Sequence, residues 1–404
     1  MSTTEESLDA GTVGEPTVAE SDRREVSGGA HFAALDGYRA IAALMVVLTH
    51  VATSSGVAIT GGVVGHVLAR FDFGVPLFFL MSGFLLYRPW VRTGLEGRAR
   101  PGLGRYALRR AARILPLYWV VVVVTLAVLP EIQPVSPQQW VTHLAGLQIY
   151  TSTGVLEGLS QTWSLCTEIS FYVVLPLVGL LATVRPSSSP ERRWRRQLVV
   201  LGLLVAVSLV YNVVLRFTDA LPYQAGFWLP AYLDWFAAGM LLALVEVRSR
   251  QGSPTRLVRL VMTLGRDQAT CLILFASLFV IALTPVAGSY DFNPTAPWES
   301  LIKHWLYLGA AFFLLLPGIV EPAEPRGWAK ALTAPVPHAL GLISYGIFLW
   351  HLVLLRLLAH WLDIPYFSGQ FWLLAAGTLG MTLPIAWVTY LLVERPAQRW
   401  AHRR

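Results

Sequence analysis

The sequence predicts an all-α protein that crosses a membrane about ten times and keeps both ends in the cytosol. Its composition is 55% hydrophobic and only 14% charged, whereas a typical soluble domain has about 25% charged residues. Apolar runs close to the ~20 residues that a bilayer requires recur along the chain. Arginines gather in alternate connections between these runs, which is typical of membrane topology rather than of a nucleic-acid surface, so we expect no nucleic-acid partner.

The chain begins with a polar segment and then continues as successive spans. Residues 1–31 are rich in Ser, Thr, Glu and Gly, which predicts a disordered cytosolic tail. The predicted spans cover 36–55, 73–92, 111–130, 162–184, 197–215, 226–247, 269–287, 300–320, 338–360 and 370–393. Residues 32–396 therefore form the predicted transmembrane domain, and the basic residues 397–404 a short cytosolic tail.

Loop charges predict the orientation of the spans. Lys and Arg are concentrated in five segments: 92–110, 185–196, 248–266, 326–330 and 395–404. Three connections on the other side have none: 131–161, 288–301 and 359–370. Because positively charged loops stay in the cytosol, both termini are predicted to be cytosolic, in the cytoplasmic membrane of a bacterium.

The long connection at 131–161 contains an apolar stretch near 140–150, WVTHLAGLQIY. It is too short to span a bilayer, so we expect an interfacial or re-entrant helix. No internal repeat is visible, whereas many transporters are built from repeats.

The first span carries an unusual polar stripe in LDGYRAIAALMVVLTHV, residues 35–51. Arg39 and His50 are eleven residues apart, which is three turns plus ~20° on a helix, so they project from one face. Asp36 precedes Arg39 by three and shares that face. Ionisable groups are costly in hydrocarbon and usually face a bundle interior or a watery cavity, so this stripe predicts a functional site.

Other polar residues fall at a similar depth when 1.5 Å is counted per residue from the span ends. The middle-to-outer band contains His50, Ser82, Glu168, Asp234 and His351. Equal depth favours one shared polar cavity. Non-catalytic explanations remain open at several positions, since His50 and His351 can bridge helices and Ser82 in LMSGF suits close packing.

A second cluster lies at the base of the third span, in RRAARILPLYW. Arg110 and Arg113 are three apart and share a face. Guanidinium groups bind phosphates in a bidentate manner, so this pair suits a phosphorylated co-substrate, although a simple topology signal would also place arginines here.

The chain resembles the integral-membrane acyltransferase-3 family, typified by bacterial cell-surface O-acetyltransferases. The similarity covers about residue 32 to the C-terminus. It rests on motifs in order: Leu35-Asp36-Gly37 with Arg39 and His50; Phe78-Phe79 to Ser82-Gly83-Phe84; Arg110-Ala111-Ala112-Arg113 with Pro116, Tyr118 and Trp119; Trp163-Ser164-Leu165 to Glu168 with Phe171-Tyr172; Ser344-Tyr345 to Trp350-His351; and Glu394-Arg395-Pro396.

This resemblance implies transfer of an acyl group, usually acetyl from acetyl-CoA or another acyl-CoA, onto a hydroxyl of a sugar or glycolipid beyond the membrane. It implies that His50 and Arg39 are central and that Arg110 and Arg113 lie near the CoA phosphates. Family members often have two acidic residues where this chain has Glu168 and Ile169, which weighs against a mechanism that requires both carboxylates.

We expect His50 to act as general base or as acyl carrier, with Glu168 or His351 orienting it. The cavity is predicted to include Asp36, Ser82, Tyr118, Trp163 and Asp234. No metal is predicted, and Cys166 and Cys271 show neither zinc spacing nor a disulfide framework.

Two other functions fit part of the pattern. A glycolipid or polysaccharide carrier or flippase would use His50 as a proton relay and would show no CoA dependence. An inactive partner in an envelope complex is the other possibility, and the paired arginines and the Arg39–His50 stripe weigh against it.

Overall fold

The computed structural model describes residues 32–152, 154–183, 189–252, 255–290, 295–320 and 326–404. Within these ranges the chain folds into helices without a β-strand, which confirms the predicted all-α class. The predicted N-terminal tail, residues 1–31, lies outside the described residues.

Within the same ranges, eight helical segments are long and apolar enough to span a membrane, and two bent helix pairs bring the number to ten if each pair is one span. The eight contain α2 (Ala34–Ser55), α5 (Gly74–Glu96), α6 (Leu103–Val128), α8 (Thr162–Thr183), α9 (Pro190–Phe217), α10 (Leu233–Ser249), α13 (Pro297–Val320) and α17 (Phe371–Thr389). The bent pairs are α11 (Arg256–Arg266) with α12 (Gln268–Ala282), and α15 (Pro335–Leu342) with α16 (Ser344–Trp361). Every predicted span coincides with one of these segments, and the chain is a multi-pass membrane protein.

Shorter helices connect the spans. They are α3 (Val57–Thr60), α4 (Gly62–Ala69), η1 (Arg70–Phe73), η2 (Pro130–Ile132), α7 (Pro137–Leu144), η3 (Gln148–Tyr150), η4 (Tyr223–Phe227), η5 (Leu229–Tyr232), η6 (Pro285–Ala287) and α14 (Gly327–Ala331). The apolar stretch predicted near 140–150 forms α7 and η3. The residues predicted as a basic tail lie mostly in α18 (Arg395–His402), which continues α17 through the π-helical turn η7 (Tyr390–Glu394).

The region 256–266 differs from the sequence prediction. An arginine-rich loop is expected there, whereas the structure has α11, bent 89° from α12. Val258 and Val261 are buried on one side of α11 while its arginines lie on the other. An amphipathic helix of this kind has low average hydropathy, so its composition resembles that of a charged loop.

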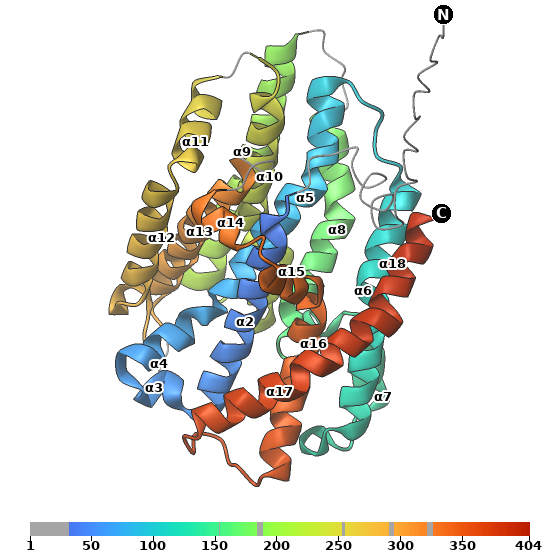
Figure 1. Cartoon of the computed structure of the whole chain (residues 1–404), viewed down its shortest axis with the longest axis vertical. Helices are drawn as coiled ribbons and strands as arrows, with labels where there is room; N and C mark the ends of the chain where they lie inside the picture. Colours follow the sequence, from blue (N-terminus) through green and yellow to red (C-terminus); the bar gives the residue numbers. More distant parts are fainter. Residues whose placement is uncertain (1–31, 153, 184–188, 253–254, 291–294, 321–325) are drawn as a thin grey trace, which may run out of the picture.

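We call the end of the bundle that carries the arginine-rich connections the inner end; it lies at the top of Figure 1. The outer end carries α3, α4 and α7, at the bottom of the view. Helix α2 lies in the middle of the bundle and packs on α5, α15, α16 and α17. Side chains on several faces of α2 therefore lie inside the protein rather than in lipid.

Two glycines let the chain approach α2 closely at its inner end. A Cβ added at Gly341 of α15 would lie 2.2 Å from the Asp36 carbonyl oxygen, and one at Gly37 would lie 2.5 Å from the Leu332 carbonyl oxygen. Only glycine allows such backbone approaches. The chain then bends by 66° between α15 and α16, and this bend places the start of α16 beside Arg39.

Candidate functional site

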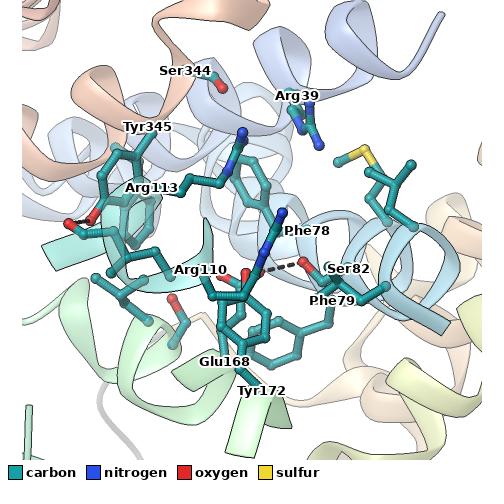
Figure 2. A pocket seen from close by; sticks show the side chains of 17 residues that line it. Arg39, Phe78, Phe79, Ser82, Arg110, Arg113, Glu168, Tyr172, Ser344 and Tyr345 are labelled. Atoms are coloured by element: carbon teal, nitrogen blue, oxygen red, sulfur yellow. Dashed lines mark hydrogen bonds between the residues drawn. The ribbon is translucent and has the colours of Figure 1, made fainter. Parts of the chain in front are cut away.

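The inner half of the bundle contains a polar cavity between α2, α5, α6, α8 and α16 (Figure 2). It encloses about 760 Å³, space open to solvent included. Its polar and aromatic lining comprises Arg39, Phe78, Phe79, Ser82, Arg110, Arg113, Ser164, Glu168, Tyr172, Ser344, Tyr345 and Phe348. We call this space the inner cavity.

Three arginines converge on the inner cavity, and they come from two helices. Arg39 of α2 is held by Asp36, whose carboxylate oxygen lies 3.1 Å from the guanidinium. The other oxygen of Asp36 lies 3.2 Å from His338 Nδ1. Arg110 and Arg113 of α6 form no ion pair with any described residue. Two cations of the lining thus remain without a bonded carboxylate, which favours an anionic ligand.

The two arginines of α6 also line a small pocket at the inner end. This basic pocket is formed by Arg109, Arg110, Arg113, Gln398, Ala401 and His402. Helix α18 packs on α6 and supplies the last three. Because Arg110 and Arg113 line both spaces, the basic pocket and the inner cavity form one continuous cationic surface.

Glu168 lines the inner cavity together with the arginines (Figure 2). Its Oε1 accepts hydrogen bonds from the Ser82 hydroxyl and from the Tyr172 hydroxyl, the latter at 2.6 Å. Ser82 therefore serves Glu168 as a hydrogen-bond donor, in addition to its place in the packing of α5. The carboxylate supplies the negative charge that partly balances the arginine cluster.

His50 lies on the outer side of the inner cavity and contacts His351 of α16. Its Nδ1 is 2.7 Å from the Val46 carbonyl oxygen and 3.3 Å from His351 Nε2. His351 Nδ1 is in turn 3.1 Å from the Ile347 carbonyl oxygen. A carbonyl only accepts, so each Nδ1 carries a hydrogen, and the Val46 carbonyl oxygen and His351 Nε2 share the single hydrogen of His50 Nδ1. This network leaves His50 Nε2 with a free lone pair, as a base or a nucleophile requires.

Two phenylalanines separate the histidine pair from the inner cavity. Phe348 lies one turn before His351 on α16, with ring centroids 6.3 Å apart, and it meets Phe78 of α5 at 6.1 Å. Both phenylalanines line the inner cavity. The histidine pair thus lies between the arginine-lined space and the outer half of the bundle.

Two cavities lie in the outer half of the bundle, and His50 and Trp163 line both of them. The larger outer cavity has about 1410 Å³, open solvent included, and its polar and aromatic lining comprises Thr49, His50, Thr53, Arg70, Asp72, Trp163, Arg216, Tyr232, Trp235, Ser289, Thr295, Ser300, Lys303, His304 and Tyr307. The smaller outer cavity lies under the connection between α7 and α8 and includes Gln148, Ser160 and Gln224.

The predicted single cavity is therefore divided. Arg39 and Glu168 line the inner cavity, whereas His50 lines the outer ones, although all three were expected in one space. Among the described residues, Glu168 forms no hydrogen bond with His50, whereas His351 contacts His50 directly. Counting residues along a span places a group only relative to that span's own ends, and the packing of the helices decides which groups share a cavity.

Three other expected cavity residues have different surroundings. Asp36 supports Arg39 without lining the inner cavity. The Tyr118 hydroxyl donates to the His143 carbonyl oxygen and accepts from Gln148 Nε2 at 3.2 Å, so it anchors the segment between α7 and α8. Asp234 is buried behind the larger outer cavity.

Several charged residues of the larger outer cavity are absent from the sequence prediction. Lys303 Nζ lies 2.6 Å from Asp72 Oδ2, and the Tyr307 hydroxyl donates to the same carboxylate. Arg70 donates to the carbonyl oxygens of Ala282, Ala287 and Gly288. Arg70 and Asp72 fall between the predicted spans 36–55 and 73–92, and Lys303 falls within the predicted span 300–320. The signal that would have found them is an Asp and a Lys inside or beside otherwise apolar runs.

His304, also unassigned from sequence, lines the larger outer cavity beside Trp235. His143, in the stretch predicted as an interfacial or re-entrant helix, is buried in α7, where its Nδ1 lies 2.8 Å from the Gln139 carbonyl oxygen. Burial lowers the pKa of His143. Among the described residues, no group of three or more His, Cys, Asp or Glu side chains is arranged to hold a metal ion.

Comparison with known proteins adds three findings. A family profile described as acyltransferase domain matches residues 32–391. The chain is 28% identical over 346 residues to the exopolysaccharide production protein ExoZ of Rhizobium meliloti, covering 84% of this chain and 93% of that protein. It is 24% identical over 387 residues to the peptidoglycan O-acetyltransferase OatA of Listeria monocytogenes, covering 90% of this chain but 55% of that protein.

A further relative is nodulation protein 10 of Rhizobium leguminosarum bv. viciae, 22% identical over 359 residues, or 81% of this chain and 82% of that protein. The chain thus spans most of two of these relatives and just over half of OatA. No solved structure matches the chain.

Proposed function

This chain belongs to the acyltransferase family whose profile covers residues 32–391, and from that premise we propose that it transfers an acyl group from a cytosolic acyl-CoA, most simply acetyl-CoA, onto a hydroxyl of a carbohydrate or glycolipid beyond the membrane. The observation that carries the proposal is the placement of the histidine pair between an arginine-lined inner cavity and two outer cavities. Such an arrangement lets a donor and an acceptor approach one imidazole from opposite sides.

The donor site of this proposal is the cationic surface of the basic pocket and inner cavity. Guanidinium groups bind phosphate oxygens through parallel hydrogen bonds, so Arg110 and Arg113 suit the phosphates of CoA. Arg39 lies further along the same cavity. From Arg39 to His50 the helix rises about 16 Å at 1.5 Å per residue, a distance that an extended thioester arm has to cover beside Phe78 and Phe348.

His50 Nε2 is the proposed chemical centre. In a direct route it takes the proton of the acceptor hydroxyl while the oxygen bonds to the acyl carbon and the carbon–sulfur bond breaks. In a two-step route Nε2 itself displaces the thiolate and carries the acyl group until the acceptor arrives. In both, His351 is a positioning residue that fixes the tautomer of His50.

The acceptor proposal follows from the relatives and from the outer cavities. ExoZ and OatA are named for exopolysaccharide production and peptidoglycan acetylation. The larger outer cavity combines Trp163, Tyr232 and Trp235 with charged and hydroxyl side chains. Flat aromatic rings beside hydrogen-bonding groups suit the alternating apolar and hydroxyl faces of a sugar.

The first test is binding and thiol release with purified chain and acetyl-CoA. We expect micromolar binding by the native chain and by His50→Ala, with thiol release lost only in His50→Ala. His360→Ala, at the exposed outer end of α16, is the control and should behave like the native chain.

Absence of CoA binding by folded native chain would contradict the acyltransferase proposal and favour the carrier, with His50 as proton relay. Exchange of label between CoA and acetyl-CoA without acceptor distinguishes the two routes, because only an acyl-enzyme supports it.

A further inference from the structure

Asp234 and His304 form a second buried pair in the outer half of the bundle. His304 Nε2 lies 2.7 Å from Asp234 Oδ2, and the two side chains are 3% and 5% exposed. The other carboxylate oxygen accepts from the Ser208 hydroxyl at 3.0 Å and from the Trp235 backbone N–H at 2.9 Å. Residues from α9, α10 and α13 thus hold one carboxylate in place.

This carboxylate sets the tautomer of His304. An ionised carboxylate only accepts hydrogen bonds, so Nε2 carries the hydrogen and Nδ1 keeps the lone pair. Among the described residues Nδ1 makes no hydrogen bond, and His304 lines the larger outer cavity.

The ring is also fixed in orientation. Trp235 stacks on it with centroids 4.6 Å apart and an interplanar angle of 21°, and Trp235 Nε1 donates to the His304 carbonyl oxygen at 3.3 Å. A base held by packing and by its own hydrogen bonds needs little reorganisation when it accepts a proton.

The two histidines of the larger outer cavity differ in their partners. His50 contacts a backbone carbonyl and the neutral acceptor His351, with no carboxylate among its described contacts. His304 has Asp234, which stabilises an imidazolium when one forms. A carboxylate-supported imidazole is the better proton acceptor, whereas an imidazole without one leaves more readily from its acylated form, because no carboxylate stabilises the positive charge of that form.

We propose that His304, positioned by Asp234, is the base that accepts the acceptor's proton in the larger outer cavity, which leaves His50 to carry the acyl group. This inference rests on the proposed function and resolves its two routes. The acceptor O–H bond breaks and its proton goes to His304 Nδ1. The oxygen bonds to the acyl carbon, and the bond from that carbon to His50 Nε2 breaks, returning the electron pair to neutral His50. Water then takes the proton from His304.

Other charged groups share this cavity and bear on the pH dependence of the step. They are Arg70 and Asp72 from η1, Arg216 from α9 and Lys303 from α13, together with the phenols of Tyr232 and Tyr307. Asp72 is paired with Lys303 at 2.6 Å, whereas Asp234 is the carboxylate that contacts His304.

The test uses full-length chain in liposomes, labelled acetyl-CoA, and envelope glycan extracted from host cells that lack this chain. His304→Gln keeps an N–H donor for Asp234 but has no basic nitrogen, and Asp234→Asn keeps the shape of the pair. We expect each to lower glycan labelling about 10²-fold or more, while acetyl-CoA binding and label exchange between CoA and acetyl-CoA persist. His360→Gln is the control for replacing a histidine.

A pH profile separates catalysis from support of the fold. Asp234→Asn removes the charge beside the proposed base, so the pH profile of glycan labelling should change its shape in this variant. A merely structural pair would reduce labelling equally at every pH and would lower the thermal midpoint.

Full labelling by His304→Gln, or loss of label exchange together with labelling, would overturn the inference. A native chain that binds acetyl-CoA and labels glycan while showing no exchange would also overturn it, since His50 would then carry no acyl group. Absence of acetyl-CoA binding by the native chain would instead remove the proposed function itself.

Discussion

At the scale of single residues, the site depends on charges that are left partly unbalanced. Three arginines line the inner cavity, whereas Glu168 is the carboxylate in its lining. Uncompensated charge inside a membrane protein is expensive and is retained where a ligand or a pathway uses it. The same reasoning applies to the imidazole of His50, whose tautomer is set by two hydrogen-bond partners rather than by solvent.

Neutralising the arginines of α6 should weaken donor binding. Arg110→Gln and Arg113→Gln each remove a charge-assisted hydrogen bond worth about 1.5–3 kcal/mol, so we expect the Kd of acetyl-CoA to rise about ten- to hundred-fold. Titration calorimetry measures this directly. Arg105→Gln, on the exposed first turn of the same helix, is the matched control, and an equal loss there would point to general electrostatics.

At the scale of helices, close packing places the functional groups. Among the described elements, α5 and α10 form the most extensive helix–helix contact. A Cβ at Gly239 of α10 would lie 1.9 Å from the Leu80 carbonyl oxygen of α5. This approach positions the start of α10, where Asp234 meets His304.

Filling the contact between α5 and α10 should destabilise the protein. Gly239→Ala forces the helices apart, and overpacking of this kind costs about 1–3 kcal/mol, so thermal unfolding in detergent should begin at a lower temperature. Gly380→Ala in α17 meets no neighbouring atom within 4 Å and should be neutral or stabilising, since alanine is the better helix former. Equal effects of the two substitutions would refute this reading.

At the scale of the whole molecule, the bundle separates two environments. The arginine-lined spaces lie toward the inner end, and both outer cavities lie toward α4, α7 and the connection before α8. His50 lines both outer cavities, and Phe78 and Phe348 separate the histidine pair from the inner cavity. This arrangement suits a donor and an acceptor that never share a compartment.

The predicted orientation has a direct test by cysteine labelling. Gln138→Cys in α7 and Arg105→Cys in α6 are both at exposed positions, and the native cysteines are buried. A membrane-impermeant thiol reagent should label Gln138→Cys in intact cells and Arg105→Cys only after permeabilisation. The opposite pattern would invert the topology and with it the assignment of donor and acceptor sides.

Much of the fold is encoded locally. The length of each apolar run is set by bilayer thickness, and the helical period alone places Arg39 and His50 on one face of α2. Exceptions such as α11 arise where an amphipathic helix has the composition of a charged loop. The motifs that mark the acyltransferase family are likewise short and readable without a structure.

The contacts that make the site required the tertiary structure. His50 meets His351, Glu168 meets Ser82, and Asp234 meets His304, across separations of 301, 86 and 70 residues. Rise per residue places a side chain relative to the ends of its own span, and the sequence by itself determines that much. Which helices are neighbours, and how each is rotated, depends on long-range packing, so only the folded bundle decided that Arg39 and Glu168 face one cavity and His50 and His304 another.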